Sequence, residues 1–202
     1  MKLYTSAASP FARKVIVAAL ELGLGDQLVL ETAGVSPVGS NPALAAHNPL
    51  GKIPTLLLED GRALFDSRVI VDFLDSLTAR RLVPADGPER WAILTEQALA
   101  DGLMDAALLA RYESALRPPE FLWKDWLEGQ MTKIHRGLDH LETAPRNTGP
   151  DVTLADIAVA CVLGYLDYRF ADEDWRSSRP RLAAFYAEFS SRPSWLASRP
   201  DA

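Results

Sequence analysis

Two short stretches near the N-terminus carry residue types that could hold and activate a small ligand. Ser9-Pro10 predicts a helix start, because serine is a favoured N-cap and proline a favoured first helical residue. The Ser9 hydroxyl and the free N–H groups of that helix could together stabilise a negative charge. Ile53-Pro54 precedes an apolar strand, and an X-Pro bond can be cis at little cost. We predict a cis corner there, with the N–H and C=O of Ile53 free to pair with an extended peptide.

The elements that must position these residues follow from the pattern of the first 79 residues. A helix beginning at Pro10 lies between two short apolar segments, which predicts a βαβ unit with parallel strands. A short helix can begin at Asn41-Pro42. Asp60-Gly61 is a hairpin turn, and Asp66-Ser67 predicts the cap of a further helix. The strands are expected at residues 2–5, 28–30, 55–58 and 62–64. This order, βαβ-α-ββα, is the thioredoxin-like arrangement.

Beyond a breaker-rich linker at residues 80–88, the pattern predicts helices only. They are expected at about 89–116, about 120–141, from 153 onward and about 181–191. Residues 154–166 are apolar on nearly every side, which predicts a helix buried at the centre of its domain. Thr153 and Asp156 form a capping box at its start. The sequence therefore predicts an α/β domain at 1–79 and an all-α domain at 89–202.

Composition excludes several classes of function. The net charge of −6 disfavours nucleic acid as the main partner, because duplex binding requires phosphate neutralisation. The single cysteine, Cys161, excludes an intrachain disulfide and a multi-cysteine zinc cluster, and it fits a reducing cytosol. The three histidines have no spacing typical of a metal site, so no metal is expected. No apolar run approaches the roughly 20 residues of a membrane helix, and the N-terminus has no signal-type pattern.

Several motifs in a fixed order carry a resemblance to a known family. They are Ser9-Pro10-Phe11, the run 48–54 (NPLGKIP), Asp66-Ser67, the capping box 153–156 (TLAD) and the run 192–195 (RPSW). Together they resemble the cytosolic glutathione S-transferases over essentially the full chain. The Ser-Pro-Phe motif looks most like a bacterial branch in which serine replaces the cysteine of omega-like and beta-like classes.

The resemblance implies the glutathione S-transferase fold, with a thioredoxin-like glutathione-binding domain and an all-α domain that forms a hydrophobic co-substrate site between the domains. It implies a cytoplasmic homodimer with a detoxification role. Glutathione would be the co-substrate, and the partner a hydrophobic small-molecule electrophile. A glutathione-dependent isomerase or dehalogenase, or a non-catalytic binding or interaction protein on the same fold, are the alternatives.

The resemblance implies that Ser9 stabilises the glutathione thiolate rather than acting as a covalent nucleophile. Two other side chains, Ser6 in the same loop and Tyr4 in the first strand, are weaker candidates for this role. Alternatively, Ser9 is only an N-cap. Disulfide exchange would need a nucleophilic sulfur beside Pro10, which Ser9 does not supply; Cys161, in the apolar helix, is expected to be an inert core residue.

The remaining site residues are carried over from the same motifs. Ile53, before a cis Pro54, would pair with the cysteinyl backbone of glutathione. Asp66 and Ser67 would bind the γ-glutamyl ammonium and carboxylate, and Lys52 the glycyl carboxylate. Alternatively, Ile53 is only an extended residue before proline, and Lys52 is a solvated loop lysine. Asp66 and Ser67 could likewise serve only to cap a helix. Arg13 and Arg68 are weaker sources of positive charge.

The co-substrate side is assigned from helical spacing after the linker. Its proposed members are Phe11, Met104, Leu108 and Arg111, with Leu103, Ala107 and Tyr112 at compatible positions. An apolar stripe of this kind is more often core than pocket.

Overall fold

The computed structural model describes residues 1–145 and 149–199, and the chain divides into two compact units. The N-terminal unit comprises Met1–Ala85 and the chain from Arg192 onward. The helical unit is Asp86–Ser191. Among the described residues, no helix is both long and apolar enough to cross a membrane.

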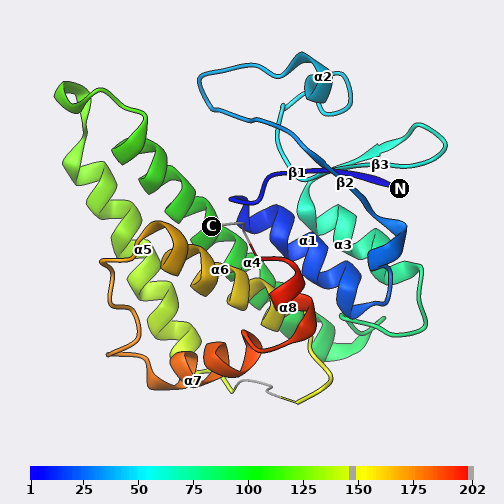
Figure 1. Ribbon diagram of the computed structural model, residues 1–202. Coiled ribbons are helices and arrows are strands. Elements are labelled where there is room, and N and C mark those ends of the chain that lie inside the picture. Colours follow the sequence, from blue (N-terminus) through cyan, green and yellow to red (C-terminus); the bar gives the residue numbers. More distant parts are fainter. Residues whose placement is uncertain (146–148, 200–202) are drawn as a thin grey trace. The chain divides into compact units, whose positions relative to one another are not determined.

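The N-terminal unit is built on a four-stranded mixed sheet of order β2-β1-β3-β4. β1 is parallel to β2, and β3 is antiparallel to both β1 and β4. The helices α1 and α3 lie together on one side of this sheet, and the short α2 lies on the other (Figure 1). The strands are β1 (Lys2–Thr5), β2 (Val29–Thr32), β3 (Thr55–Leu57) and β4 (Ala63–Leu64), and the helices are α1 (Pro10–Glu21), η1 (Gly25–Gln27), α2 (Pro42–Ala45) and α3 (Ser67–Ser76).

This is the thioredoxin-like arrangement expected from the sequence, with small differences at element ends. β2 runs from Val29 to Thr32 rather than over 28–30, and its side chains are exposed at the sheet edge. The predicted caps are confirmed: the Ser9 side chain caps α1, Asn41 caps α2 and Asp66 caps α3. Local capping chemistry therefore sets where the helices of this unit begin.

The helical unit consists of α4 (Gly87–Ala115), η2 (Pro119–Phe121), α5 (Lys124–Thr143), α6 (Leu154–Arg169) and α7 (Pro180–Phe189). α6 packs against α4, and α7 packs against α5 (Figure 1). The first 13 residues of α6, Leu154–Leu166, are all buried, and the predicted capping box of Thr153 and Asp156 is present. The expected helix at about 120–141 begins later, at Lys124, because Pro119–Phe121 forms a separate 3-10 turn.

The C-terminal segment differs from the expected domain boundary of 89–202. It forms a further short helix, α8 (Pro193–Ala197), which belongs to the N-terminal unit and lies beside α1 (Figure 1). The Arg13 guanidinium lies 3.4 Å from the Trp195 ring centroid, and its Nη2 donates to the Trp195 carbonyl at 3.1 Å. Arg192 donates from Nε and Nη2 to the two carboxylate oxygens of Glu21, each at 3.0 Å. These contacts join residues more than 170 positions apart, so no local pattern could reveal them.

Candidate functional site

Ser9 occupies the position that the sequence predicted, between the end of β1 and the first turn of α1. Its backbone N–H donates to the Ser6 carbonyl at 2.9 Å, and its Oγ accepts from the Ala12 N–H at 3.2 Å. Capping uses only a lone pair of the hydroxyl oxygen. Within the described chain the hydroxyl hydrogen has no acceptor, so Ser9 can cap α1 and still donate to a ligand.

The two weaker candidates are placed less favourably. Tyr4 is buried within the sheet, where its ring stacks on His47 at 5.6 Å between centroids. Ser6 lies three residues before the cap, and its backbone carbonyl is used by Ser9. Of the three hydroxyl groups, the one at the N-terminus of α1 has the strongest electrostatic reason to stabilise an anion.

The loop that leads to Pro54 is closed by two buried polar side chains, Asn48 and Thr55. The Asn48 Nδ2 donates to the Lys52 carbonyl and to Thr55 Oγ1, each at 3.0 Å. Thr55 Oγ1 in turn donates to the same Lys52 carbonyl at 2.8 Å, and Asn48 Oδ1 accepts from the Leu50 N–H at 3.0 Å. Asn48 is 1% exposed and Thr55 is 0% exposed, so water does not compete for these bonds.

Gly51 completes this loop with a φ of 59°, a left-handed conformation that glycine adopts without a Cβ penalty. In the sequence, residues 48–54 served only as a motif of the family resemblance, and neither Asn48 nor Thr55 was assigned to the site. The sequence feature that could have indicated this loop is the pair of polar residues Asn48 and Thr55, which lie seven positions apart on either side of a turn. The loop is a hydrogen-bonded unit that fixes the residue after Lys52.

That residue is Ile53, and the Ile53–Pro54 peptide bond is cis, as predicted. The Ile53 side chain packs against the buried cluster of Tyr4, Ala33 and Leu44. Neither the N–H nor the C=O of Ile53 is hydrogen bonded within residues 1–145 and 149–199. The side chain is therefore anchored while both backbone groups are left for an extended partner.

Asp66 and Ser67 lie at the start of α3. Asp66 Oδ1 accepts from the Arg68 N–H at 2.9 Å, and its Oδ2 lies 3.8 Å from the Arg68 Nε. The Ser67 side chain is buried, yet its hydroxyl has no partner among the described residues. Asp66 is thus occupied as the cap, and Ser67 retains a hydroxyl donor at a helix N-terminus, where a carboxylate is favoured.

The basic residues considered for anion binding, Lys52 and Arg13, differ in their surroundings. Lys52 is exposed. Arg13 is held at α8, where its Nε also donates to Ser198 Oγ at 3.2 Å. Arg13 therefore has a structural role in attaching the C-terminal helix to α1.

The predicted co-substrate residues are split between the units. Phe11 is half-buried in the N-terminal unit, whereas Met104, Leu108 and Arg111 lie on α4 of the helical unit. Met104 has no exposed surface, which fits a core residue better than a lining residue. Leu108 and Arg111 are partly exposed and lie about one turn apart.

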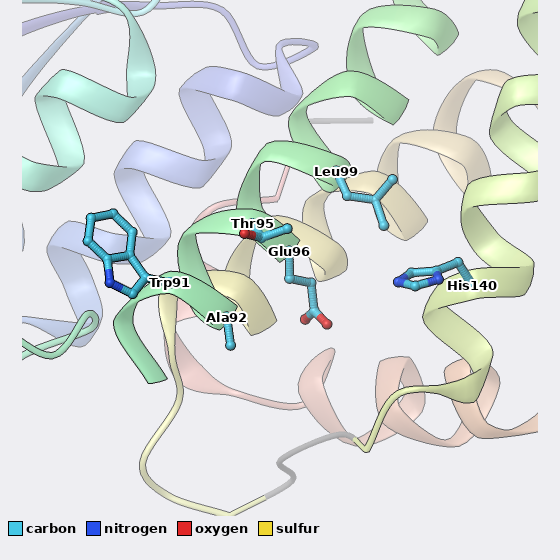
Figure 2. Close-up of a pocket in the computed structure, with 6 residues that line it drawn as sticks. All are labelled: Trp91, Ala92, Thr95, Glu96, Leu99 and His140. Atoms are coloured by element: carbon cyan, nitrogen blue, oxygen red, sulfur yellow. The ribbon is translucent and has the colours of Figure 1, made fainter. Parts of the chain in front are cut away.

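A surface pocket of about 360 Å³ lies elsewhere in the helical unit. Figure 2 shows Trp91, Ala92, Thr95, Glu96 and Leu99 of α4 on one side of it and His140 of α5 on the other. The sequence reading did not single out this pocket. Its lining combines one carboxylate and one imidazole with apolar and hydroxyl groups, and the candidate residues discussed above are not among its lining residues.

Comparisons with known proteins agree with this architecture. The family model described as "Glutathione S-transferase, N-terminal domain" matches residues 8–77, and "Glutathione S-transferase, C-terminal domain" matches residues 124–188. The GST-like protein YibF of Escherichia coli is 37% identical, covering 99% of this chain and 98% of its own length.

Solved structures of a glutathione transferase family member from Pseudomonas fluorescens are also similar. One, with bound glutathione, is 49% identical with a TM-score of 0.96, covering 100% of this chain and 99% of that chain. Another, with bound S-(propanoic acid)-glutathione, is 48% identical with a TM-score of 0.91, covering 99% of both chains.

Proposed function

Because the chain belongs to the glutathione S-transferase family, we propose that it is a transferase that activates the glutathione thiolate at Ser9 for attack on hydrophobic electrophiles. The observation that carries the proposal is the Ser9 hydroxyl, which caps α1 and keeps its hydrogen available. The Pseudomonas fluorescens relative with bound glutathione supports glutathione as the co-substrate.

The reaction requires the thiolate form of glutathione. A free thiol of this type has a pKa of about 8.5, so most of it is protonated at neutral pH. A donated hydrogen bond from Ser9 and the partial positive charge at the start of α1 both favour the anion. The thiol proton has already left to solvent when the sulfur forms a bond to the electrophilic carbon. An aryl halide then loses its halide with the electron pair of the carbon–halogen bond, whereas in an enone the C=C electron pair moves toward the carbonyl oxygen and the product takes up a proton from solvent.

The binding groups proposed for glutathione lie in the N-terminal unit. The N–H and C=O of Ile53, after the closed loop and before Pro54, pair with the cysteinyl backbone. Ser67 donates to the γ-glutamyl carboxylate, Asp66 accepts from the ammonium group, and Lys52 pairs with the glycyl carboxylate. In this account Asn48 and Thr55 are positioning residues, because they act through the loop and do not touch the ligand.

The co-substrate side is proposed to draw on Phe11 of the N-terminal unit and on Leu108 and Arg111 of α4, and Met104 is buried in the helical unit. We assign glutathione binding to residues 1–79 and co-substrate binding to the helices after the linker 80–88. We also propose a cytoplasmic homodimer with a detoxification role, as in the family that the sequence motifs resemble.

The test is steady-state conjugation of glutathione to a panel of aryl halides and enones. Ser9→Ala should lower kcat/KM about 100-fold, the lower end of the range for removing one preorganised donor to a developing anion. Ser6→Ala, in the same loop, is the matched control and should stay close to the unaltered protein. Retention on immobilised glutathione should persist in both variants. Undiminished turnover in Ser9→Ala would contradict the role of Ser9.

A further inference from the structure

We propose that Arg111, Tyr112, Tyr165 and Arg169 form an anion subsite in the helical unit, which selects electrophiles that carry a carboxylate. This inference rests on the proposed transferase function and names the substrate class of the same site. All four residues belong to α4 and α6, the two helices that pack together at the core of the unit.

The first observation is that two half-buried arginines lack carboxylate partners. Arg117, Arg176 and Arg179 of the same unit each have a carboxylate oxygen within 2.7 Å. Across residues 1–145 and 149–199, neither Arg111 nor Arg169 contacts a carboxylate. Burying part of a guanidinium without a counter-charge costs free energy, so the arrangement is better explained by an anion that arrives with a ligand.

The acid nearest to Arg111 in sequence is not free to pair with it. Glu113 is buried and accepts from the Trp123 N–H at 3.0 Å, and its Oε1 lies 2.7 Å from the Arg117 Nε. Its carboxylate is therefore used to join α4 to the following turn. Arg111 is left with its five N–H donors directed to no internal acceptor within the described chain.

The second observation is that both arginines lie within electrostatic range of one buried phenol, Tyr165. Tyr165 is 5% exposed, and Arg169 lies one turn further along α6. Arg111 and Tyr112 of α4 lie within electrostatic range of the same phenol. Burial raises the pKa of both Tyr112 and Tyr165, so both phenols stay protonated at neutral pH and can donate to an anion.

Aromatic rings lie next to two of these residues. The Phe170 ring meets the Tyr165 ring edge-on at 6.5 Å between centroids, and the Arg169 guanidinium lies 4.2 Å from the Tyr168 ring centroid. Guanidinium groups bind carboxylates through paired, charge-assisted hydrogen bonds. The subsite thus suits a ligand with an aromatic or aliphatic body and a carboxylate at one end.

The carboxylate is not consumed in the reaction. With 4-chloro-3,5-dinitrobenzoate as substrate, the glutathione sulfur bonds to the carbon that bears chlorine. Chloride leaves with the electron pair of the broken C–Cl bond, and the carboxylate at the far end of the ring stays bound to the subsite.

The test is a comparison of two glutathione conjugates of equal length, measured by titration calorimetry. S-(2-carboxyethyl)glutathione carries the carboxylate, and S-propylglutathione has a methyl group in its place. We expect the protein to bind the carboxylated conjugate about tenfold more tightly, near the lower end of the range for a hydrogen bond to a charged group. Arg111→Gln should remove most of this preference and should weaken binding of the carboxylated conjugate much more than binding of the propyl conjugate.

Companion variants separate recognition from structure. Arg111→Lys keeps the charge and should retain part of the preference, and Tyr112→Phe removes one hydroxyl with minimal change of shape. Arg136→Gln removes an exposed arginine of α5 and should retain the full preference. Equal affinity for the two conjugates in the unaltered protein would overturn the proposal, as would an equal loss for both conjugates in Arg111→Gln.

Failure of the transferase proposal can be recognised separately. If the protein conjugates glutathione to 1-chloro-2,4-dinitrobenzene but shows no carboxylate preference, only the anion subsite is wrong. If it binds neither glutathione nor the conjugates, the proposed function fails. The subsite is then judged by direct binding of 4-chloro-3,5-dinitrobenzoate against 4-chloro-3,5-dinitrobenzamide, and equal or absent binding would overturn it.

Discussion

The loop at residues 48–54, which is proposed to bind glutathione, and the proposed anion subsite of the helical unit are built in opposite ways. In the loop, the side chains of Asn48 and Thr55 hold the Lys52 carbonyl by hydrogen bonds. The backbone N–H and C=O of Ile53 have no hydrogen-bond partner in the described part of the chain. In the subsite, side chains such as Arg111 have no carboxylate partner among residues 1–145 and 149–199.

This difference in binding groups determines which kind of ligand each region can recognise. Backbone groups at fixed positions bind a ligand with a constant backbone, which is what a tripeptide co-substrate offers. Half-buried arginines and phenols recognise a chemical group on a ligand whose remaining shape can vary. The fixed backbone groups therefore suit glutathione, which is the same in every reaction, and the charged side chains suit an electrophile whose shape can vary. The predictions below change one region at a time, beginning with the largest effect.

Asn48→Ala should have the largest effect, because it removes three hydrogen bonds from a buried loop. We expect a loss of about 3 kcal/mol in the free energy of unfolding, since buried partners are left unsatisfied. Glutathione affinity should fall together with stability. Thr55→Val keeps the side-chain shape and removes only the hydroxyl, so its loss should be smaller. Urea unfolding and calorimetric titration with glutathione measure both quantities, and unchanged affinity in a folded Asn48→Ala protein would refute the positioning role.

Glu21→Gln should weaken the attachment of α8 to α1 by about 2 kcal/mol, within the range for charge-assisted hydrogen bonds. The Glu21 side chain is 8% exposed, and its carboxylate accepts from Arg192 and Ser194. Burial raises the pKa of Glu21, but the hydrogen bonds from Arg192 and Ser194 and the nearby arginine charges outweigh it and leave the pKa lowered.

The sign of the pH dependence follows from that lowered pKa. A carboxylate with a lower pKa in the folded state contributes stability above its unfolded value of 4.5, and this stability is lost as pH falls through the folded pKa. Unfolding free energies measured between about pH 3 and pH 6 should therefore fall more steeply on acidification in the unaltered protein than in Glu21→Gln. Parallel curves would contradict this linkage.

Ser9→Cys should place a reactive thiol at the start of α1. We expect its pKa to lie about one unit below the free value of 8.5, which corresponds to about 1.4 kcal/mol. Its thiolate should displace one glutathione from oxidised glutathione, which forms a mixed disulfide at position 9 and releases reduced glutathione. Mass spectrometry detects the adduct, and Ser6→Cys is the matched control. No adduct at position 9 would contradict the placement of this residue.

Arg111→Met should have the smallest effect on stability, because the guanidinium has no carboxylate partner among the described residues to lose. We expect a change within about 0.5 kcal/mol, or a slight stabilisation. Urea unfolding measures this change, and Arg179→Met is the comparison variant. Arg179→Met should lose more unfolding free energy, because Arg179 is buried and its Nε donates to Asp139 Oδ1 at 2.9 Å. A large loss in Arg111→Met would mean that Arg111 is structural.

Sequence reasoning reached the parts of the molecule that depend on local chemistry. The caps at Ser9, Asp66 and Thr153 mark helix starts, and the Asp60-Gly61 turn marks the β3–β4 hairpin, because each involves residues a few positions apart. The cis corner at Pro54 was predicted for the same reason.

Parts that depend on distant side chains were not predicted. The position of α8 follows from pairs such as Arg192 and Glu21, which are separated by 171 residues. The grouping of Arg111 with Tyr165 depends on how α4 and α6 face each other, which apolar periodicity does not specify. Met104 matched the spacing of a lining residue but is fully buried, because the same stripe of α4 also forms the core.

The central claim is that Ser9 at the start of α1 stabilises the glutathione thiolate. The most direct measurement is the pKa of the bound glutathione thiol, followed by thiolate absorbance near 240 nm across a pH titration of the complex. We expect a pKa about one to two units below 8.5 in the unaltered protein and a return toward 8.5 in Ser9→Ala, with glutathione still bound. The same thiol pKa in both proteins would contradict it.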